Sequence, residues 1–244
     1  LQAALWITVG IGVLAMPALD LWRRREGTAV TLALWVWGTF AFSAFLNWSV
    51  TARTILPMIP AVGLLTARQV QADAEGRGTK AEDRTIILPL VLAAALALAV
   101  AWGDMLLANS ARSAARHMSQ AWSTMAGDLL FQGHWGFQYY MEQGGAKAMD
   151  LRAISMQPGD RLVMPRNNCN LVEPTNLHLR ELERHNIEVP WFVTTNGARQ
   201  TAGYYSSVLG PLPFVFGPVP PEVYDVYALK SANTEFAPRS APPR

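Results

Sequence analysis

The stretch NWSVTARTILPMIPAVGLLTA, residues 47–67, decides how this chain of 244 residues is organised. Within it a single arginine, Arg53, separates an apolar run that ends at Trp48 from a second apolar run that Pro57 and Pro60 interrupt. A charged side chain between two apolar runs lies at or just inside a membrane boundary. There it faces the interior of a helix bundle or a water-filled cavity and has an anionic partner. The stretch therefore predicts a polytopic membrane protein.

Four apolar segments fill the first half of the chain. A helix rises about 1.5 Å per residue, so about 20 apolar residues cross the hydrocarbon core of a bilayer, which is about 30 Å thick. The first segment is apolar from its first residue and lacks the basic start of a signal peptide, so we expect it to be a membrane helix in the C-terminal part of a longer protein. We predict a membrane all-α bundle over residues 1–108, with helices at about 1–19, 30–48, 52–70 and 85–108.

Charge and cysteine content exclude two classes of function. The formal net charge is +2, and the chain has no polybasic block that would suit nucleic acid. Cys169 is the single cysteine, so neither an intrachain disulfide nor a cysteine-based metal cluster can form. We expect no nucleic-acid partner, no metal site and no cofactor.

The side of the membrane on which the chain ends depends on the third apolar segment. The connector after the first segment holds three arginines at 23–25, and this excess of positive charge predicts that the connector is cytoplasmic. The apolar residues 55–67 reach only about 20 Å, so they either cross within a longer helix over 52–70 or re-enter on one side. We favour crossing, which places everything after residue 109 outside the cytoplasm. Re-entry places it inside.

Past residue 109 the composition changes to that of a small α/β domain, which we predict over 109–236 in an extracytoplasmic position. The alternation of helix and strand predicts a mostly parallel or mixed sheet. The proline-rich tail, 237–244, is predicted to be disordered. The predicted elements are an amphipathic helix at 111–125, a short aromatic helix at 133–142, strands at 161–165, 189–195 and 223–229, and a helix at 175–185 capped by Thr175 or Asn176.

Three stretches together resemble one family of membrane enzymes. The segment ARTILPMIPA, residues 52–61, is similar to the "RY-hydrophobic-LP-x-x-P" segment of bacterial integral-membrane glycosyltransferases. These are the C-superfamily enzymes related to family 39, which includes protein O-mannosyltransferases. The stretches GHWGFQYYME (133–142), with the turn at 158–160, and GYYSSVLGPLPFVFGP (203–218) resemble the extracytoplasmic C-terminal domain of bacterial members. One departure is Thr54, which stands where the family usually has tyrosine.

The resemblance covers most of this chain but only the C-terminal part of the family. It implies a transferase that takes a sugar from a polyprenyl-phosphate-linked donor at the outer face of the bacterial inner membrane. The implied partners are that donor, membrane lipid, and a lipid, glycan or protein acceptor. The family's catalytic acidic residues lie in a first extracytoplasmic loop that no part of this chain matches, so we expect them to be missing here. The alternative function is a non-catalytic, membrane-anchored extracytoplasmic module for binding or assembly.

Arg53 is the candidate ligand for the donor's phosphate. A planar guanidinium holds two phosphate oxygens by parallel hydrogen bonds, whereas the alternative is an arginine that merely extends to lipid headgroups. His134, Trp135 and Tyr139 are candidates for contacts to the acceptor or to sugar, because aromatic faces can stack on sugar rings. Filling the domain core or resting on the bilayer is the alternative for these aromatic residues. Asp104, near the outer end of the fourth segment, is predicted to be interfacial.

Overall fold

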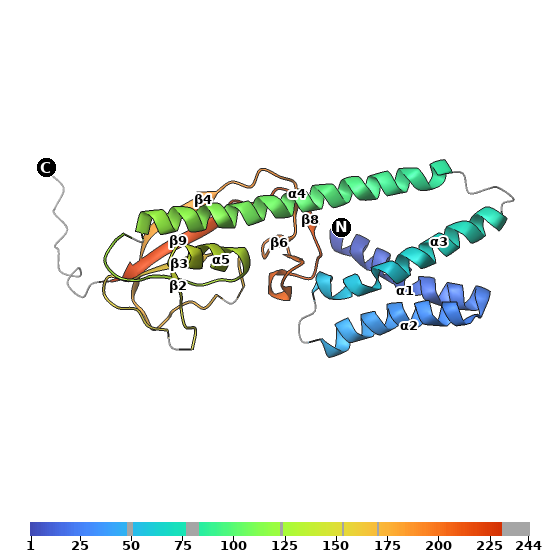
Figure 1. The fold of residues 1–244 in the computed structure, drawn as a ribbon, viewed down its shortest axis with the longest axis horizontal. Helices are drawn as coiled ribbons and strands as arrows, with labels where there is room; N and C mark the ends of the chain where they lie inside the picture. Colours follow the sequence, from blue (N-terminus) through green and yellow to red (C-terminus); the bar gives the residue numbers. More distant parts are fainter. Residues whose placement is uncertain (48–50, 77–82, 123, 153, 170, 231–244) are drawn as a thin grey trace. The chain divides into compact units, whose positions relative to one another are not determined.

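The computed structural model describes the chain apart from residues 48–50, 77–82, 123, 153, 170 and 231–244 (Figure 1). The predicted disordered tail, 237–244, lies outside the described residues. The chain forms two compact units: Leu1–Asp104 with Trp191–Pro218, and Met105–Pro190 with Val219–Arg244. We call them the helical unit and the sheet unit. Residues 191–218 therefore belong to the same unit as the helices, whereas the composition predicts one domain over 109–236 that includes them.

The helical unit contains α1 (Gln2–Arg24), α2 (Gly27–Ala41), the π-helix η1 (Phe42–Leu46), the 3₁₀-helix η2 (Ala52–Met58), α3 (Ile59–Gly76) and the first part of α4 (Asp83–Trp122). Among the described residues, three helices are long and apolar enough to cross a membrane: Gln2–Arg24, Gly27–Leu46 and Ile87–Trp122. Three of the four predicted spans are thereby confirmed as helices of sufficient length and apolarity. The third predicted span, 52–70, forms η2 and most of α3 and is not among them.

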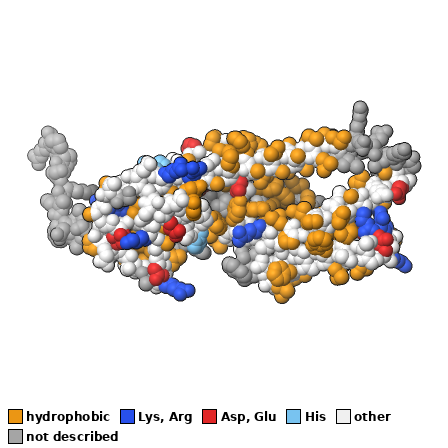
Figure 2. Space-filling view, viewed as in Figure 1, with side chains coloured by type: hydrophobic (Ala, Val, Ile, Leu, Met, Phe, Trp, Pro, Cys, Tyr) orange, Lys and Arg blue, Asp and Glu red, His pale blue; other side chains and the backbone are white. Residues whose placement is uncertain are grey.

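The helices of this unit leave most of their large apolar side chains exposed. Figure 2 shows these side chains gathered over the helices. One buried cluster of the unit joins α2 to α3 and consists of Leu32, Val36, Ala61 and Leu65. An exposed apolar surface of this extent is compatible with a membrane protein, because lipid covers such a surface.

The segment that follows α2 returns along it in the opposite direction. At one end, the Ser43 hydroxyl of η1 donates to the backbone oxygen of Thr54 in η2 at 2.9 Å. At the other end, Arg68 of α3 forms ion pairs with Asp20, at 3.2 Å, and with Glu26. Asp20 lies near the end of α1, and Glu26 is the N-cap of α2. The far half of α3 therefore lies where α1 ends and α2 begins.

The sheet unit is built on a mixed five-stranded sheet with the order β2-β1-β3-β9-β4. This architecture confirms the predicted small α/β region with a mixed sheet. The strands are β1 (Leu129–Phe131), parallel to β2 (Lys147–Ala148) and β3 (Arg161–Pro165), and β9 (Glu222–Leu229), antiparallel to β3 and β4 (Leu179–Ile187). The strongly buried core joins side chains of the sheet to Ala114, Ala115 and Met118 of α4 and to Phe137 and Met141 of α5 (Trp135–Gln143).

One predicted helix is a strand. Residues 179–185 are predicted to lie in a helix over 175–185, because Leu179 and Leu182 are one helical turn apart. They form β4 instead, which pairs with β9 from Leu179 to Ile187 with one irregularity between Glu181 and Glu183. Leu182 and Ile187 pack against the core of the sheet unit. Pairing with β9 and burial of these side chains outweigh the weak local preference for helix.

Other predicted elements differ less from the observed ones. The strands predicted at 161–165 and 223–229 are β3 and β9, and the aromatic helix is α5. The predicted helices at 85–108 and 111–125 are one continuous helix, α4. Within the predicted strand at 189–195 only β5 (Val193–Thr194) forms, and it pairs with β8 (Val215–Phe216) in the helical unit. The other elements there are β6 (Asn196–Gly197), β7 (Ala202–Gly203) and η3 (Ser207–Leu209).

Candidate functional site

Residues 191–218, which we call the cap segment, contact the beginning of α1. The side-chain amide of Gln2 donates to the backbone oxygen of Phe216 at 2.7 Å and accepts from its backbone nitrogen at 2.8 Å. The rings of Trp6 and Phe214 meet edge to face, with their centroids 4.8 Å apart. Edge-to-face pairs of this kind add stability beyond the apolar area that they bury. The later part of the cap segment is therefore held on the first turns of α1.

The first part of the cap segment contacts α4. The Trp191 indole donates to the backbone oxygen of Ala99 at 2.9 Å. A Cβ atom at Gly103 would lie 2.6 Å from the backbone oxygen of Val193 and 3.0 Å from the Trp191 ring. Gly103 has no such atom, so the cap segment can approach the helix this closely.

Asp104 joins the cap segment to α4 through two hydroxyl groups. Its carboxylate accepts hydrogen bonds from Thr195 Oγ1 at 2.8 Å and from the Tyr205 hydroxyl at 2.6 Å. Burial, followed by the hydrogen bond to Asp104, raises the pKa of Tyr205, while the charge of Arg53 acts in the opposite direction. Arg53 is therefore close enough to Tyr205 for its charge to act on that hydroxyl. We call Arg53, Asp104, Thr195 and Tyr205 the cap cluster.

Arg53 is the second residue of η2, and its side chain is exposed. Among the residues that the structure describes, no carboxylate forms an ion pair with it. The neighbouring Thr54 hydroxyl donates to the backbone oxygen of Thr51 at 2.7 Å, so Thr54 stabilises the turn from which Arg53 extends. The guanidinium of Arg53 is thus available to an anionic ligand.

The other predicted contact residues, His134, Trp135 and Tyr139, lie in or next to the first turns of α5 in the sheet unit. His134 Nδ1 is 3.1 Å from Gln138 Oε1, so this imidazole takes part in a local hydrogen bond. Trp135 and Tyr139 are exposed, whereas Phe137 between them is buried in the core. The aromatic run is therefore divided: Phe137 fills the core, and Trp135 and Tyr139 are exposed at the surface.

Two carboxylates of β9 are buried in the sheet unit. Asp225 accepts hydrogen bonds from Arg184 Nε at 2.7 Å and from Arg166. Burial alone would raise the pKa of Asp225, but the hydrogen bonds from both arginines outweigh it and lower that pKa. Burial raises the pKa of Glu222 to about 7, although the side chain of Asn167 donates a hydrogen bond to it at 2.7 Å. Both carboxylates thus form these hydrogen bonds within the sheet unit.

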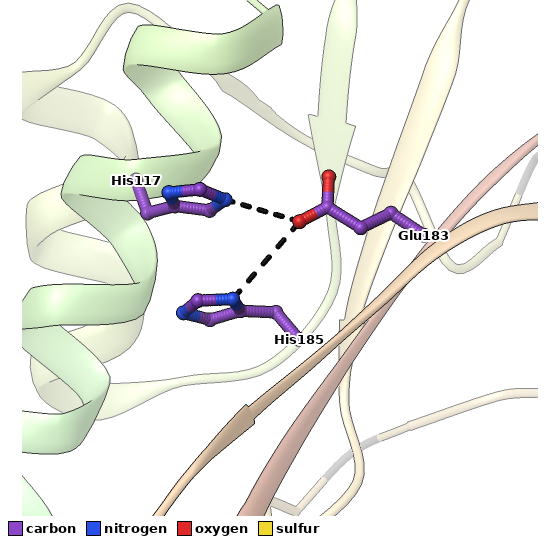
Figure 3. A group of neighbouring side chains, drawn as sticks. All are labelled: His117, Glu183 and His185. Atoms are coloured by element: carbon purple, nitrogen blue, oxygen red, sulfur yellow. Dashed lines mark hydrogen bonds and ion pairs between the residues drawn. The ribbon is translucent and has the colours of Figure 1, made fainter.

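A second polar group, which the sequence analysis missed, joins α4 to β4. His117, Glu183 and His185 point toward one another (Figure 3). His117 Nε2 lies 3.0 Å from Glu183 Oε1, and His185 Nδ1 lies 4.0 Å from the same oxygen. Burial and the neighbouring His117 lower the pKa of His185, and Glu183 partly opposes them. This imidazole therefore favours its neutral form, whose lone pair can accept a proton or bind a cation.

The sequence did not reveal this group of three side chains, because Glu183 and His185 were predicted to lie in a helix. Side chains two residues apart share one face of a strand, whereas in a helix they point about 200° apart. Glu183 and His185 therefore come together only once residues 179–187 are known to be β4. His117 is 66 positions away from Glu183, and no local pattern connects the two.

Comparison with known proteins adds no further assignment. No protein-family model matches this chain, no curated protein matches it, and no solved structure matches it.

Proposed function

We propose that this chain is the C-terminal portion of a membrane glycosyltransferase that moves a sugar from a polyprenyl-phosphate-linked donor to an acceptor. The observation that carries the proposal is Arg53, an exposed guanidinium whose charge acts on Tyr205 of the cap segment and which forms no ion pair with a carboxylate among the described residues. Guanidinium binds phosphate oxygens through two parallel hydrogen bonds and stays charged at every relevant pH. In this role it stabilises the charge that develops on the departing phosphate.

The proposal places Arg53 at the outer face of the bacterial inner membrane. The contacts at both ends of η2 and α3 support this placement, because they show the segment returning along α2 as far as Asp20 and Glu26. In this proposal α2 spans the membrane and the segment beside it crosses the membrane as well. With a cytoplasmic arginine-rich connector, the fourth crossing ends outside and the sheet unit is extracytoplasmic. An alkaline phosphatase fused after Asn109 should then be active, and a fluorescent cytoplasmic reporter at this position would contradict the topology.

The cap segment has a specific place in this proposal. It contacts the beginning of α1 through Gln2 and the middle of α4 through Asp104, and the charge of Arg53 acts on Tyr205 within it. We propose that it closes the donor site over the phosphate. The exposed rings of Trp135 and Tyr139 are the surfaces proposed to meet the acceptor.

The test measures binding of polyprenyl phosphate to the full-length protein in nanodiscs, with the unphosphorylated polyprenol as the ligand control. Arg53→Ala should lower the affinity for polyprenyl phosphate about 10- to 100-fold, because a hydrogen bond to a charged group contributes about 1.5–3 kcal/mol. Arg53→Lys should recover part of the loss, since lysine keeps the charge but not the two-point geometry. The matched control is Arg23→Ala, which removes an exposed arginine from the last turn of α1.

Two outcomes would contradict the proposal. Equal affinity of the wild type and Arg53→Ala for polyprenyl phosphate would show that Arg53 does not bind the donor. Equal binding of polyprenol and polyprenyl phosphate would show that the phosphate is not recognised. Sugar transfer is measured in parallel in the full-length protein. Binding that is lost in Arg53→Ala, without any transfer by the wild type, would favour the alternative of a non-catalytic binding module.

A further inference from the structure

The group formed by His117, Glu183 and His185 has the composition of a metal centre. Two imidazoles and one carboxylate are the three protein ligands found in many catalytic zinc sites, where water or substrate takes the fourth position. The candidate ligand atoms of the three side chains all lie within 4.8 Å of one another. We propose that these residues bind one divalent transition-metal ion, Zn²⁺ or an ion of similar preference. This site is independent of Arg53 and of the proposed donor site.

The observed distances require only small movements of the side chains. In a tetrahedral site with metal–ligand distances of about 2.0–2.2 Å, neighbouring ligand atoms lie about 3.3 Å apart. His117 Nε2 and His185 Nδ1 lie 3.0 Å and 4.0 Å from Glu183 Oε1. The two imidazoles are stacked, with centroids 4.3 Å apart and planes 9° apart. One ring must therefore turn about its Cβ–Cγ bond to aim both lone pairs at one ion, and this torsion is broad in histidine.

The carboxylate of the site is already oriented by a neighbour. The Trp122 indole donates to Glu183 Oε2 at 3.1 Å, which leaves Oε1 directed at the histidines. Hydrogen bonds of this kind from outside the ligand set orient metal ligands, and their loss commonly costs 10- to 100-fold in metal affinity. The backbone positions of the site are also well supported. Met118, next to His117 in α4, is fully buried, and both Glu183 and His185 are paired with residues of β9 beyond the irregularity in β4.

The surroundings favour an anionic oxygen or water as the fourth ligand. An open groove of about 490 Å³ runs along α4 past His117 and is lined by Asn109, Arg112, Ser113, Arg116, His117 and Gln120. The positive charges of Arg112 and Arg116 disfavour a metal ion without an anionic ligand, and they attract an anion that approaches the bound metal. The Arg112 guanidinium also lies 5.6 Å from the centre of the Tyr140 ring, which holds it at one side of the groove. The centre would thus bind the metal through Glu183 and the two histidines and keep one position open.

The test is a titration of the full chain, purified in detergent with its affinity tag removed and stripped of metal. Co²⁺ serves as the probe, because its visible absorption reports tetrahedral nitrogen and oxygen ligands, and Zn²⁺ is then added to displace it. The wild type should bind one equivalent of Co²⁺ and release it to Zn²⁺. His117→Asn, His185→Asn and Glu183→Gln should each lower the affinity at least 100-fold. The last variant keeps an acceptor for the Trp122 indole.

His178→Asn is the matched control, since His178 is an exposed histidine next to β4 and outside the group. The affinity of His178→Asn for Co²⁺ should stay within about threefold of that of the wild type. The affinity of Trp122→Phe for Co²⁺ should be about 10- to 100-fold lower. Thermal melting of the metal-free proteins shows whether each variant is folded, and Zn²⁺ should raise the melting temperature of the wild type but not of His185→Asn. Absence of binding by the wild type would overturn the proposal. Equal binding by a folded His117→Asn/His185→Asn double variant would do so too.

Discussion

The helical unit exposes many of its large apolar side chains, whereas the sheet unit buries many of its own in its core. In the sheet unit Phe131 and Phe137 are each 1% exposed, whereas Leu92 on α4 in the helical unit is 61% exposed. The sheet unit thus makes its own core, and the surface of the helical unit is the kind that lipid completes. The polar groups follow the same division. Asp225 is paired with two arginines inside the sheet unit, whereas in the helical unit Asp20 pairs with Arg68 of α3 and Asp104 of α4 accepts hydrogen bonds from the cap segment.

The largest effect that would sharpen this comparison concerns Asp225. The double variant Arg166→Ala/Arg184→Ala leaves its carboxylate buried without a cation, which should destabilise the sheet unit by about 3–5 kcal/mol. Hydrogen exchange of the β3 and β9 amides in the full-length protein measures this loss. Arg180→Ala, an exposed arginine of the same strand β4, is the control. Unchanged protection of β9 in the double variant would show that the two arginines do not stabilise Asp225.

The next effect concerns the pH dependence of the sheet unit through Glu222. Its folded pKa of about 7 lies above the ordinary value of 4.5, so the folded state keeps a proton that the unfolded state loses between these pH values. Stability therefore falls as the pH rises from about 4.5 to about 7 and stays level above that.

Glu222→Gln removes this dependence and should raise stability at pH 8 by about 3 kcal/mol, with little change at pH 4. Denaturant unfolding of the full-length protein at both pH values measures the difference. Glu173→Gln, at an exposed position, should leave the pH profile as it is. The same pH dependence of the free energy of unfolding in Glu222→Gln and the wild type would contradict the prediction.

A smaller, local effect is expected where the cap segment meets α4. Asp104→Ala removes the acceptor for both Thr195 and Tyr205. It should lower the free energy of local opening of residues 195–205 by about 2 kcal/mol, because each of these hydrogen bonds involves a charged acceptor. Hydrogen exchange of that segment is the measurement. The amides of β9 should exchange at the wild-type rate. If the amides of β9 exchange faster in Asp104→Ala and those of the cap segment do not, the prediction of a local effect in the cap segment is wrong.

The smallest effect is expected on the exposed face of α4. Leu92→Ala should change stability in a bilayer by less than about 1 kcal/mol, since the leucine contacts lipid whether or not the helices have assembled. Leu162→Ala in the sheet unit, where the leucine is fully buried, should cost about 2–5 kcal/mol. Unfolding in the presence of lipid measures both. A large loss for Leu92→Ala would mean that protein rather than lipid covers that face.

Long or strongly patterned elements could be predicted from the sequence. The apolar runs predicted α1, α2 and the first part of α4, and the short runs at 161–165 and 223–229 predicted β3 and β9. The segment at 179–187 could not be predicted, because its two leucines suit a helix and only pairing with β9 decides for a strand. The contacts of the cap segment could not be predicted for the same reason. Its short strands pair among themselves, and its contacts are with α1 and α4.

For the candidate site, the sequence by itself determined that an arginine, Arg53, stands between two apolar runs, since composition and spacing are local properties. Only the tertiary structure decided what surrounds it. Asp104 and Tyr205 are 101 positions apart and His117 and Glu183 are 66 apart. Contacts over such separations form only after the chain has folded, when backbone pairing and burial, rather than neighbouring residues, bring the side chains together.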